Sequence, residues 1–278
     1  SVPYSVFYKD GRAASKRLAS LMGDKVFENP KDEEIIQRII QFCGVNDGEI
    51  VLDFFSGSGT TAHSLFLANL EQHVKRKFIL VQLPEKIDPS REITEKAKKV
   101  AQNAIKLLND LKLPHTICEI GKERIRRAGN KIKDENPLLA QDLDVGFRVF
   151  KVDSSNMKDV YYSADEYNQD ILVKLESNIK EDRNDLDLLF GCLLEWGLPL
   201  SLPYSSEEID GCTVHNYNDG DLIACFNDNV PDSVIKEIAN KKPLRAVFRD
   251  SCFENSPSKI NVGEIFKLLS PDTRVKVI

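Results

Sequence analysis

The residues with the clearest chemical potential lie in one short stretch, IVLDFFSGSGTT, at positions 50–61. An apolar run before Asp53 predicts a buried strand, and the strand ends in the carboxylate of that residue. A loop with Gly57 and Gly59 follows, and a helical pattern comes directly after it. Glycines allow a tight turn and let backbone N–H groups approach a ligand closely. The stretch therefore predicts the first half of a nucleotide-cradling α/β unit.

Asp53 is the unusual residue of this pattern. A carboxylate at the carboxyl end of the strand, just before the loop, suits a ligand that carries positive charge better than it suits phosphate alone. S-adenosylmethionine carries such a charge on its methionyl ammonium group. Asp53 therefore favours this ligand.

Two other glycine-loop ligands fit parts of the pattern. The spacing GxGxxA at 57–62 matches the dinucleotide fingerprint, which expects an acid about 20 residues further on. The next strand, at 78–83, carries Gln82 near its end, and the nearest acid is Glu85, which weakens the NAD interpretation without excluding it. A phosphate-binding P-loop needs a lysine before the threonine pair, where this chain has a glycine. A tight turn without any ligand is the remaining alternative.

Several segments together point to one family. DFFSGSGTT resembles the S-adenosylmethionine-binding motif of amino-group DNA methyltransferases: an Asp, two bulky residues and a Gly-Ser-Gly-Thr-Thr-like loop. FENPKDEEIIQRII, at 27–40, resembles the segment that these enzymes place just upstream of that motif. Four later segments are similar to the Mod subunit of Type III restriction–modification systems: KRKFILVQLPE, GKERIRRAG, GFRVFKVDSSN and SPDTRVKVI.

This resemblance covers nearly all of the 278 residues. It implies transfer of a methyl group from S-adenosylmethionine to adenine N6 within a short DNA site, in the bacterial cytoplasm. The implied partners are double-stranded DNA through the intact protein, a second Mod subunit and the restriction (Res) helicase–nuclease subunit. No membrane and no metal are implied.

The resemblance also implies a role for each candidate cofactor residue. Asp53 and the glycine loop would hold the methionyl end, Phe54 and Phe55 would pack the loop and flank the adenine, and Lys31 would approach the methionine carboxylate. A surface role for Lys31 stays equally open. The family's ribose-binding acid is replaced by Gln82, so Gln82 and Glu85 compete for that role. The full predicted set is Asn29, Pro30, Lys31, Asp53, Phe54, Phe55, Ser56, Gly57, Ser58, Gly59, Thr60, Thr61, Gln82 and Glu85.

The catalytic motif of these methyltransferases, (Asp/Asn/Ser)-Pro-Pro-(Tyr/Phe), does not occur in the chain. The nearest match is Ser201-Leu202-Pro203-Tyr204, which lacks the first proline and which we interpret as a turn. We therefore expect no catalytic residue here. The chain is predicted to be a C-terminal fragment of the methyltransferase that is inactive alone. The alternative is a non-enzymatic scaffold or assembly module with a vestigial cofactor loop.

Composition limits the remaining functions. The net charge of −6 argues against a main DNA-binding surface, because neutralising phosphates needs clustered lysines and arginines. One basic cluster does lie at 122–133, and it is usual for such a run to be a solvated helix face. Its predicted but weak phosphate contacts are Arg124, Arg126 and Arg127. No apolar run approaches the ~20 residues of a membrane span. The six cysteines and four histidines are dispersed, which predicts reduced, mostly buried thiols and no metal site.

The order of predicted elements indicates two domains. Residues 1–26 are expected to be a lead-in segment, 27–135 the S-adenosylmethionine-binding part of a methyltransferase domain, and 145–278 a C-terminal α/β assembly domain. Alternating strands and helices are typical of a doubly wound parallel sheet. The predicted fold class is therefore α/β: part of a Rossmann-like S-adenosylmethionine-dependent methyltransferase sheet, followed by a second small α/β domain.

The expected elements follow from hydrophobic periodicity and from turn residues. Helices are expected at 12–22, 30–43, 59–70, 90–112, 119–133, 165–179, 183–196, 231–240 and 259–269. Strands are expected at 50–55, 78–83, 116–118, 146–153, 212–217, 221–226, 244–249 and 273–278. Asn218-Asp219-Gly220 predicts a hairpin turn between two of these strands. The stretch 185–197 is apolar nearly all round, which suits burial in a core or in an interface.

Overall fold

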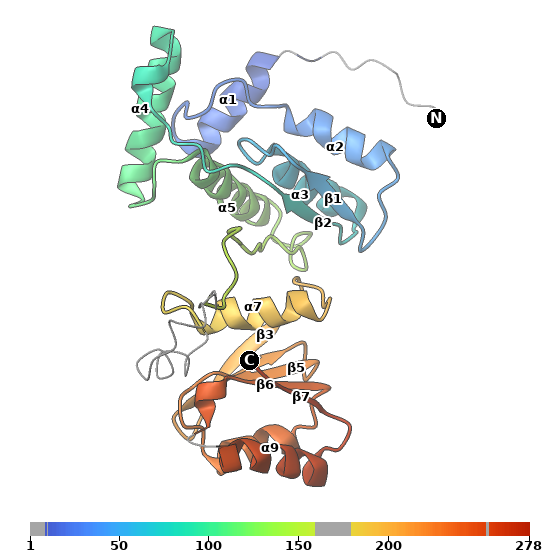
Figure 1. The fold of residues 1–278 in the computed structure, drawn as a ribbon. Helices are drawn as coiled ribbons and strands as arrows, with labels where there is room; N and C mark the ends of the chain where they lie inside the picture. Colours follow the sequence, from blue (N-terminus) through green and yellow to red (C-terminus); the bar gives the residue numbers. More distant parts are fainter. Residues whose placement is uncertain (1–8, 10, 159–178, 254–255) are drawn as a thin grey trace. The chain divides into compact units, whose positions relative to one another are not determined.

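A computed structural model describes residues 9, 11–158, 179–253 and 256–278 of the chain (Figure 1). The chain divides into two compact units, Ser1–Phe147 and Arg148–Ile278, which we call the N-terminal and the C-terminal unit. Both combine helices with strands, which confirms the predicted α/β class. The helix expected at 165–179 falls, except for its last residue, outside the described residues. None of the described helices is both long and apolar enough to cross a membrane.

The N-terminal unit is built on a pair of parallel strands. Strand β1 (Ile50–Asp53) lies beside β2 (Lys77–Leu80), with Leu52 opposite Ile79. Figure 1 shows helices gathered on one side of this pair. The helices of the unit are α1 (Gly11–Met22), α2 (Glu33–Phe42), α3 (Thr60–Gln72), α4 (Glu95–Asp110) and α5 (Ile117–Glu135), with a 3-10 turn, η1 (Pro89–Arg91).

The strand pair is covered on one face and open on the other. Alternate strand residues, such as Val51 and Phe78, pack with buried residues of α3. Because side chains alternate along a strand, the intervening residues point to the opposite face. Among the residues that the structure describes, nothing buries that face. Its four apolar side chains are 41–56 % exposed: Ile50, Leu52, Ile79 and Val81.

Three sequence predictions for the N-terminal unit are wrong in their details. The helix expected from residue 30 begins at Glu33, because the side chain of Asp32 caps it. The helix expected at 90–112 begins at Glu95, where the Thr94 hydroxyl accepts a hydrogen bond from Ala97 N (3.1 Å). The strand expected at 116–118 is only a single bridge between Thr116 and Lys86, because the residues that follow start α5.

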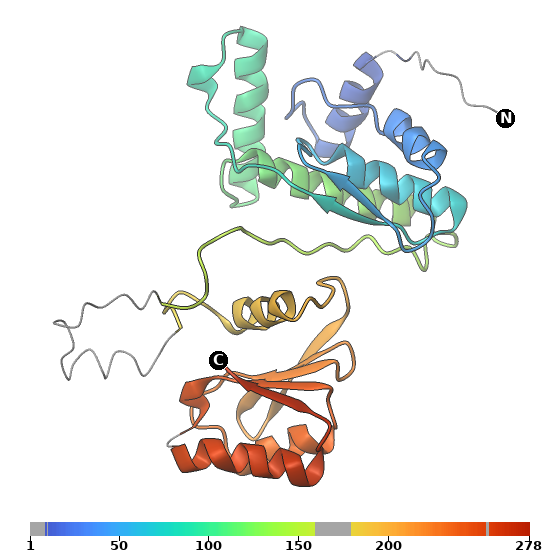
Figure 2. The same ribbon diagram turned by 45° about the vertical axis from the view of Figure 1, so that its right-hand side comes forward.

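The C-terminal unit is a five-stranded mixed sheet with helices on both faces (Figure 2). Strands β3 (Tyr204–Ile209), β4 (Cys212–Tyr217) and β5 (Leu222–Cys225) are antiparallel neighbours. Strands β5, β6 (Arg245–Phe248) and β7 (Arg274–Val277) are parallel. Helix α7 (Asp185–Glu195) packs on one face, and α8 (Asp232–Asn240) and α9 (Ser256–Leu269) pack on the other.

A hairpin and two strands compare the predicted with the observed elements of the C-terminal unit. The turn predicted at 218–220 is confirmed, and all three residues have positive φ angles. Strand β3 was not expected, because most of its residues are polar and exposed. The strand expected at 146–153 is wrong, since these residues have no regular secondary structure and no described strand pairs with them. Ser201, Leu202 and Pro203 lie in the predicted turn, and Tyr204 is the first residue of β3.

Helix α7 uses its apolar residues unevenly. Leu188, Leu189 and Leu193 are buried in the core of the C-terminal unit, whereas Leu194 is exposed. Burial in a core therefore accounts for one side of this helix. The predicted buried thiols are confirmed for four cysteines: Cys192, Cys212, Cys225 and Cys252. Burial raises the pKa of Cys225 and of Cys252 to about 12, so both stay protonated.

Candidate cofactor-binding loop

The glycine loop, residues 54–59, joins the carboxyl end of β1 to the first residue of α3. Ser56 N donates to Val81 O (3.2 Å), and Gly59 N donates to Ser56 O (2.8 Å). Gly57 and Gly59 have φ angles of 49° and 73°. Residues with a Cβ rarely adopt this left-handed region, so the turn requires glycine at these two positions.

Asp53 braces the loop from within. Its Oδ1 accepts from Phe55 N (3.0 Å), and its Oδ2 accepts from the Thr61 hydroxyl (2.6 Å). The carboxylate is half-buried. Its two hydrogen bonds connect the start of the loop to the first turn of α3. Asp53, the residue predicted to bind the ammonium group, therefore accepts hydrogen bonds from the loop and from α3.

Gln82 and Glu85 lie in different surroundings. Gln82 Oε1 accepts from Gly57 N (2.8 Å), so its amide is engaged with the loop. The side chain of Glu85 is exposed. Of the two competing ribose ligands, only Gln82 contacts the glycine loop in the described part of the chain.

The aromatic and upstream residues of the predicted site point in several directions. Phe54 and Phe55 are 62 % and 88 % exposed, so neither ring is buried against the loop, and their place beside the adenine stays a prediction. Phe27 lies nearer, since its Cζ would be 3.4 Å from a Cβ at Gly57. Pro30 is buried and Lys31 is exposed.

Helix α5 forms the floor of the loop through direct backbone contact. A Cβ built at Gly121 would lie 3.1 Å from Gly57 O, and one built at Gly59 would lie 3.1 Å from Gly121 O. Both distances are tighter than ordinary contacts of real Cβ atoms. A side chain at either position would therefore require the helix and the loop to move apart by a few tenths of an ångström.

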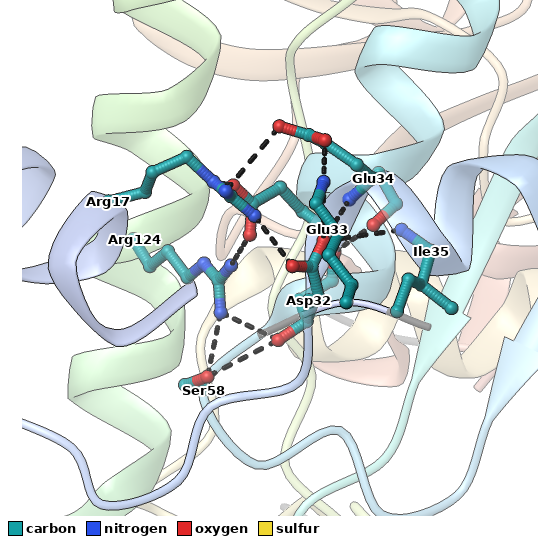
Figure 3. A network of polar contacts seen from close by, with 10 residues as sticks. Arg17, Asp32, Glu33, Glu34, Ile35, Ser58 and Arg124 are labelled. Atoms are coloured by element: carbon teal, nitrogen blue, oxygen red, sulfur yellow. Dashed lines mark hydrogen bonds and ion pairs between the residues drawn. The ribbon is translucent and has the colours of Figure 1, made fainter. Parts of the chain in front are cut away.

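Arg124, one turn further along α5, points its guanidinium at Ser58 of the loop (Figure 3). Its side chain is 1 % exposed, and Nη1 donates to Ser58 Oγ (2.8 Å) and to Thr60 Oγ1 (2.6 Å). Its Nη2 lies 3.7 Å from Glu33 Oε2 at the start of α2. Burial lowers the pKa of the guanidinium to about 10, and the Glu33 carboxylate opposes this shift. Arg124 is therefore charged at neutral pH.

The acids beside Arg124 have a second arginine partner. Arg17 of α1 forms an ion pair with Asp32 (2.9 Å between Nη2 and Oδ2) and another, through Nε, with Glu33. Both carboxylates are buried, and Figure 3 shows their contacts with the two arginines. We call Arg17, Asp32, Glu33 and Arg124 the charge cluster. It connects three helices to the glycine loop.

The phosphate contact predicted for Arg124 is contradicted by its burial. A DNA phosphate cannot reach a guanidinium that is enclosed by the loop and by Glu33. Arg126 is 47 % exposed and lies over the ring of Phe147, and Arg127 pairs with Glu123 (2.7 Å). For these two residues the phosphate role stays a prediction.

Sequence reasoning missed the charge cluster. In the sequence, Asp32 and Glu33 belong to the upstream segment and Arg124 to the basic cluster at 122–133, and no pattern singles out Arg17. The adjacent acids that follow Lys31 were a usable signal, because two neighbouring carboxylates before an apolar helix often cap it or pair with cations. Their partners, about 15 and 90 residues away, carried no local signal.

His63, on α3, lies next to the same cluster. Burial, together with the positive charge of Arg124, lowers its pKa from 6.5 to about 4. Its Nδ1 is buried and receives no hydrogen bond from the residues that the structure describes. His63 is thus a neutral group at neutral pH.

This histidine predicts a pH dependence of the stability of the N-terminal unit. Between about pH 6.5 and 4 the unfolded chain binds a proton at His63 that the folded chain does not bind. Stability should therefore fall as pH falls through this window, by up to about 3 kcal/mol from this residue. Thermal unfolding of His63→Gln should show a shallower pH profile than the parent chain. His115→Gln, at an exposed histidine, is the control, and parallel profiles for all three proteins would refute the prediction.

Comparison with known proteins gives matches to one family model and to several curated proteins. A family model for DNA methylases matches residues 3–88. The Type III restriction–modification Mod subunit EcoPI of Escherichia phage P1 is 35 % identical over 276 residues, which cover 92 % of this chain and 38 % of that protein. The EcoP15I Mod subunit of Escherichia coli is 28 % identical over 275 residues, covering 95 % of this chain and 37 % of that protein.

The chain belongs to the Type III Mod family. The StyLTI Mod subunit of Salmonella typhimurium is also similar, with 38 % identity over 143 residues, 51 % of this chain and 19 % of that protein. The chain thus spans less than two fifths of the length of these Mod subunits. The residues matched by the DNA methylase model, 3–88, include β1, the glycine loop, α3 and β2. They also include the segment that carries Asp32 and Glu33.

Proposed function

We propose that this chain supplies the S-adenosylmethionine-binding part of a Type III DNA adenine-N6 methyltransferase. The observation that carries the proposal is the glycine loop at the carboxyl end of parallel strands, with Asp53 at its base. In open α/β sheets, ligands bind outside the carboxyl ends of the strands. Membership in the Mod family supports a methyl donor over a dinucleotide.

The residues present suit the two charges of the methionyl group. Gly59 caps α3 without any side-chain hydrogen bond, so the first N–H groups of that helix have no side-chain acceptor. A helix N-terminus of this kind favours a carboxylate. The Asp53 carboxylate favours an ammonium. Lys31 would add a positive charge near the carboxylate, and Gln82 or Glu85 would hold the ribose.

The chemistry assigns a supporting role to this chain. When bound, S-adenosylmethionine supplies an electrophilic methyl group for the amino nitrogen of a flipped adenine. The loop residues of this chain hold and orient the donor, which lowers the entropy cost of the transfer. The group that contacts the amine is expected elsewhere in the intact protein, so the chain alone should be inactive.

The open face of the strand pair supports the same proposal. Four apolar side chains on that face are about half exposed, although strands of a parallel sheet are normally buried on both faces. The relatives are more than twice as long as this chain. We therefore propose that β1 and β2 (within 27–135) are part of a larger Rossmann-like sheet, which other parts of the intact protein cover. The region 1–26 would be its lead-in.

The remaining assignments concern partners. The C-terminal domain (145–278) would serve assembly with a second Mod subunit and with the Res subunit. Arg126 and Arg127 would contact phosphates of the DNA. These roles rest on the Mod family and on the composition of the chain.

One observation favours the scaffold alternative. Both oxygens of Asp53 and the amide oxygen of Gln82 already accept hydrogen bonds within the N-terminal unit. A loop that satisfies its own polar groups can persist without a ligand. In that case the chain would act only in protein assembly.

Calorimetric titration with S-adenosylmethionine tests these alternatives. The proposal expects selective binding that weakens at least about tenfold in Asp53→Asn, since the substitution removes a charge-assisted contact at nearly constant shape. Asp53→Ala should abolish binding, because it also removes the loop's own brace. Selective binding of NAD would overturn the proposal, and binding of neither ligand would favour the scaffold.

A further inference from the structure

The glycine loop contacts one charged side chain, Arg124, that comes from a distant part of the sequence. Arg124 comes from α5, more than 60 residues later, and a single nitrogen, Nη1, donates to the hydroxyl of Ser58 in the loop and to that of Thr60, the first residue of α3. Ser58 and Thr60, which carry these hydroxyls, are themselves buried. No ligand contact is therefore needed to explain why the two side chains point to α5.

Stability alone is a poor explanation for this arginine. Removing a guanidinium from water is costly, and exchanging a buried ion pair for apolar residues is often neutral or stabilising. The pair with Glu33 is also long, at 3.7 Å, and Arg124 Nε has no hydrogen-bond partner among the described residues. The strong contacts of Arg124 are those to the loop.

The same contacts connect the two segments that we propose for S-adenosylmethionine. Thr60 is followed by Thr61, whose hydroxyl donates to Asp53 (2.6 Å). On the other side, Nη2 faces Glu33, two residues after Lys31. Arg124 therefore lies between the glycine loop and the upstream segment. Gly121 lets the backbone of α5 come close enough for this contact.

We propose that Arg124 is a positioning residue that sets the glycine loop in its ligand-binding shape through Ser58 and Thr60. It does not touch the ligand, because it is enclosed beneath the loop. The identity of the ligand as S-adenosylmethionine rests on the function proposed above. The positioning of the loop by Arg124 can be measured without that ligand.

The test uses two variants that remove the contact from opposite sides. Arg124→Met removes the donor, and the double variant Ser58→Ala/Thr60→Val removes the acceptors while it keeps the ion pair of Arg124 with Glu33. Arg76→Met is the matched control. Arg76 is also a buried arginine with hydrogen bonds to Val45 O (2.6 Å) and to Asn69, but it lies at the opposite end of β2.

Two quantities are measured in the complete chain. Affinity for S-adenosylmethionine should fall about tenfold to a hundredfold in Arg124→Met and in Ser58→Ala/Thr60→Val, because small displacements of orienting groups have effects of this size. It should stay within about twofold of the parent value in Arg76→Met. Amide hydrogen exchange of residues 53–62, measured without ligand, should accelerate in Arg124→Met and in Ser58→Ala/Thr60→Val but not in Arg76→Met. Arg124→Lys should recover little affinity, since one ammonium cannot donate to Ser58 and Thr60 and also face Glu33, as Nη1 and Nη2 of Arg124 do together.

A double-mutant cycle separates positioning from a general structural role. In the Ser58→Ala/Thr60→Val background, Arg124→Met should change the affinity by less than about threefold, because its partners are already gone. Additive losses, or unchanged affinity and exchange in Arg124→Met, would overturn the proposal. If the parent chain binds no S-adenosylmethionine, the proposed function fails. Hydrogen exchange then still decides whether Arg124 positions the loop.

Discussion

Glu33→Leu is expected to lower the free energy of unfolding of the N-terminal unit by about 3–5 kcal/mol. The substitution leaves Arg124 charged, buried and without its acidic partner, and breaking a buried ion pair from one side typically has this cost. Arg17 loses the same partner but keeps Asp32. Urea denaturation, followed by hydrogen exchange of peptides from α3 and α5, measures the change in this unit.

The charge-balanced variant Glu33→Leu/Arg124→Met is the control for this result. It removes both members of the pair, so most of the lost stability should return. If Arg124 positions the loop, the affinity for S-adenosylmethionine should not return with it. Equal destabilisation in the single and the double variant would show that lost contacts, and not the unpaired charge, cause the effect.

Phe248→Ala should destabilise the C-terminal unit by about 3–5 kcal/mol. Phe248 lies on β6 inside the sheet and is fully buried, with the rings of Phe253 and Phe266 at 5.9 Å and 6.1 Å. Truncating a buried phenylalanine removes its apolar contacts and leaves a cavity. Trp196 is the single tryptophan of the chain and lies in this unit, so its fluorescence reports the transition.

Phe150→Ala is the matched substitution at a half-exposed ring. Phe150 contacts Phe190 (5.1 Å between ring centroids), and its loss should cost no more than about 1.5 kcal/mol. Similar losses from both substitutions would mean that the sheet core does not dominate the stability of this unit.

Elements with a strong local signal were predictable from the sequence. The strand that ends at Asp53, the glycine turn and α3 follow from an apolar run, two glycines and a helical pattern within about 20 residues. The hairpin at 218–220 needs residues that tolerate positive φ angles, and Asn, Asp and Gly are those residues. Each of these signals acts over a few neighbouring positions.

Elements that depend on a distant partner were not predictable. Strand β3 is polar and exposed along most of its length, and it exists because β4 pairs with it. Residues 146–153 have the alternation of a strand, but no described strand lies beside them. Hydrogen-bonded pairing, and not alternation, decides whether an extended segment becomes part of a sheet.

Arg124 shows the division most clearly. The sequence by itself determined the glycine loop, the position of Asp53 and the basic character of α5, because composition and spacing are local properties. Only the tertiary structure decided which arginine of α5 points inward. Gly121 lets α5 approach the loop, and the loop hydroxyls and Glu33 provide the partners that a buried charge requires. Arg124, expected at the surface, is thus buried beside the candidate site, because residues far apart in the chain provide its partners.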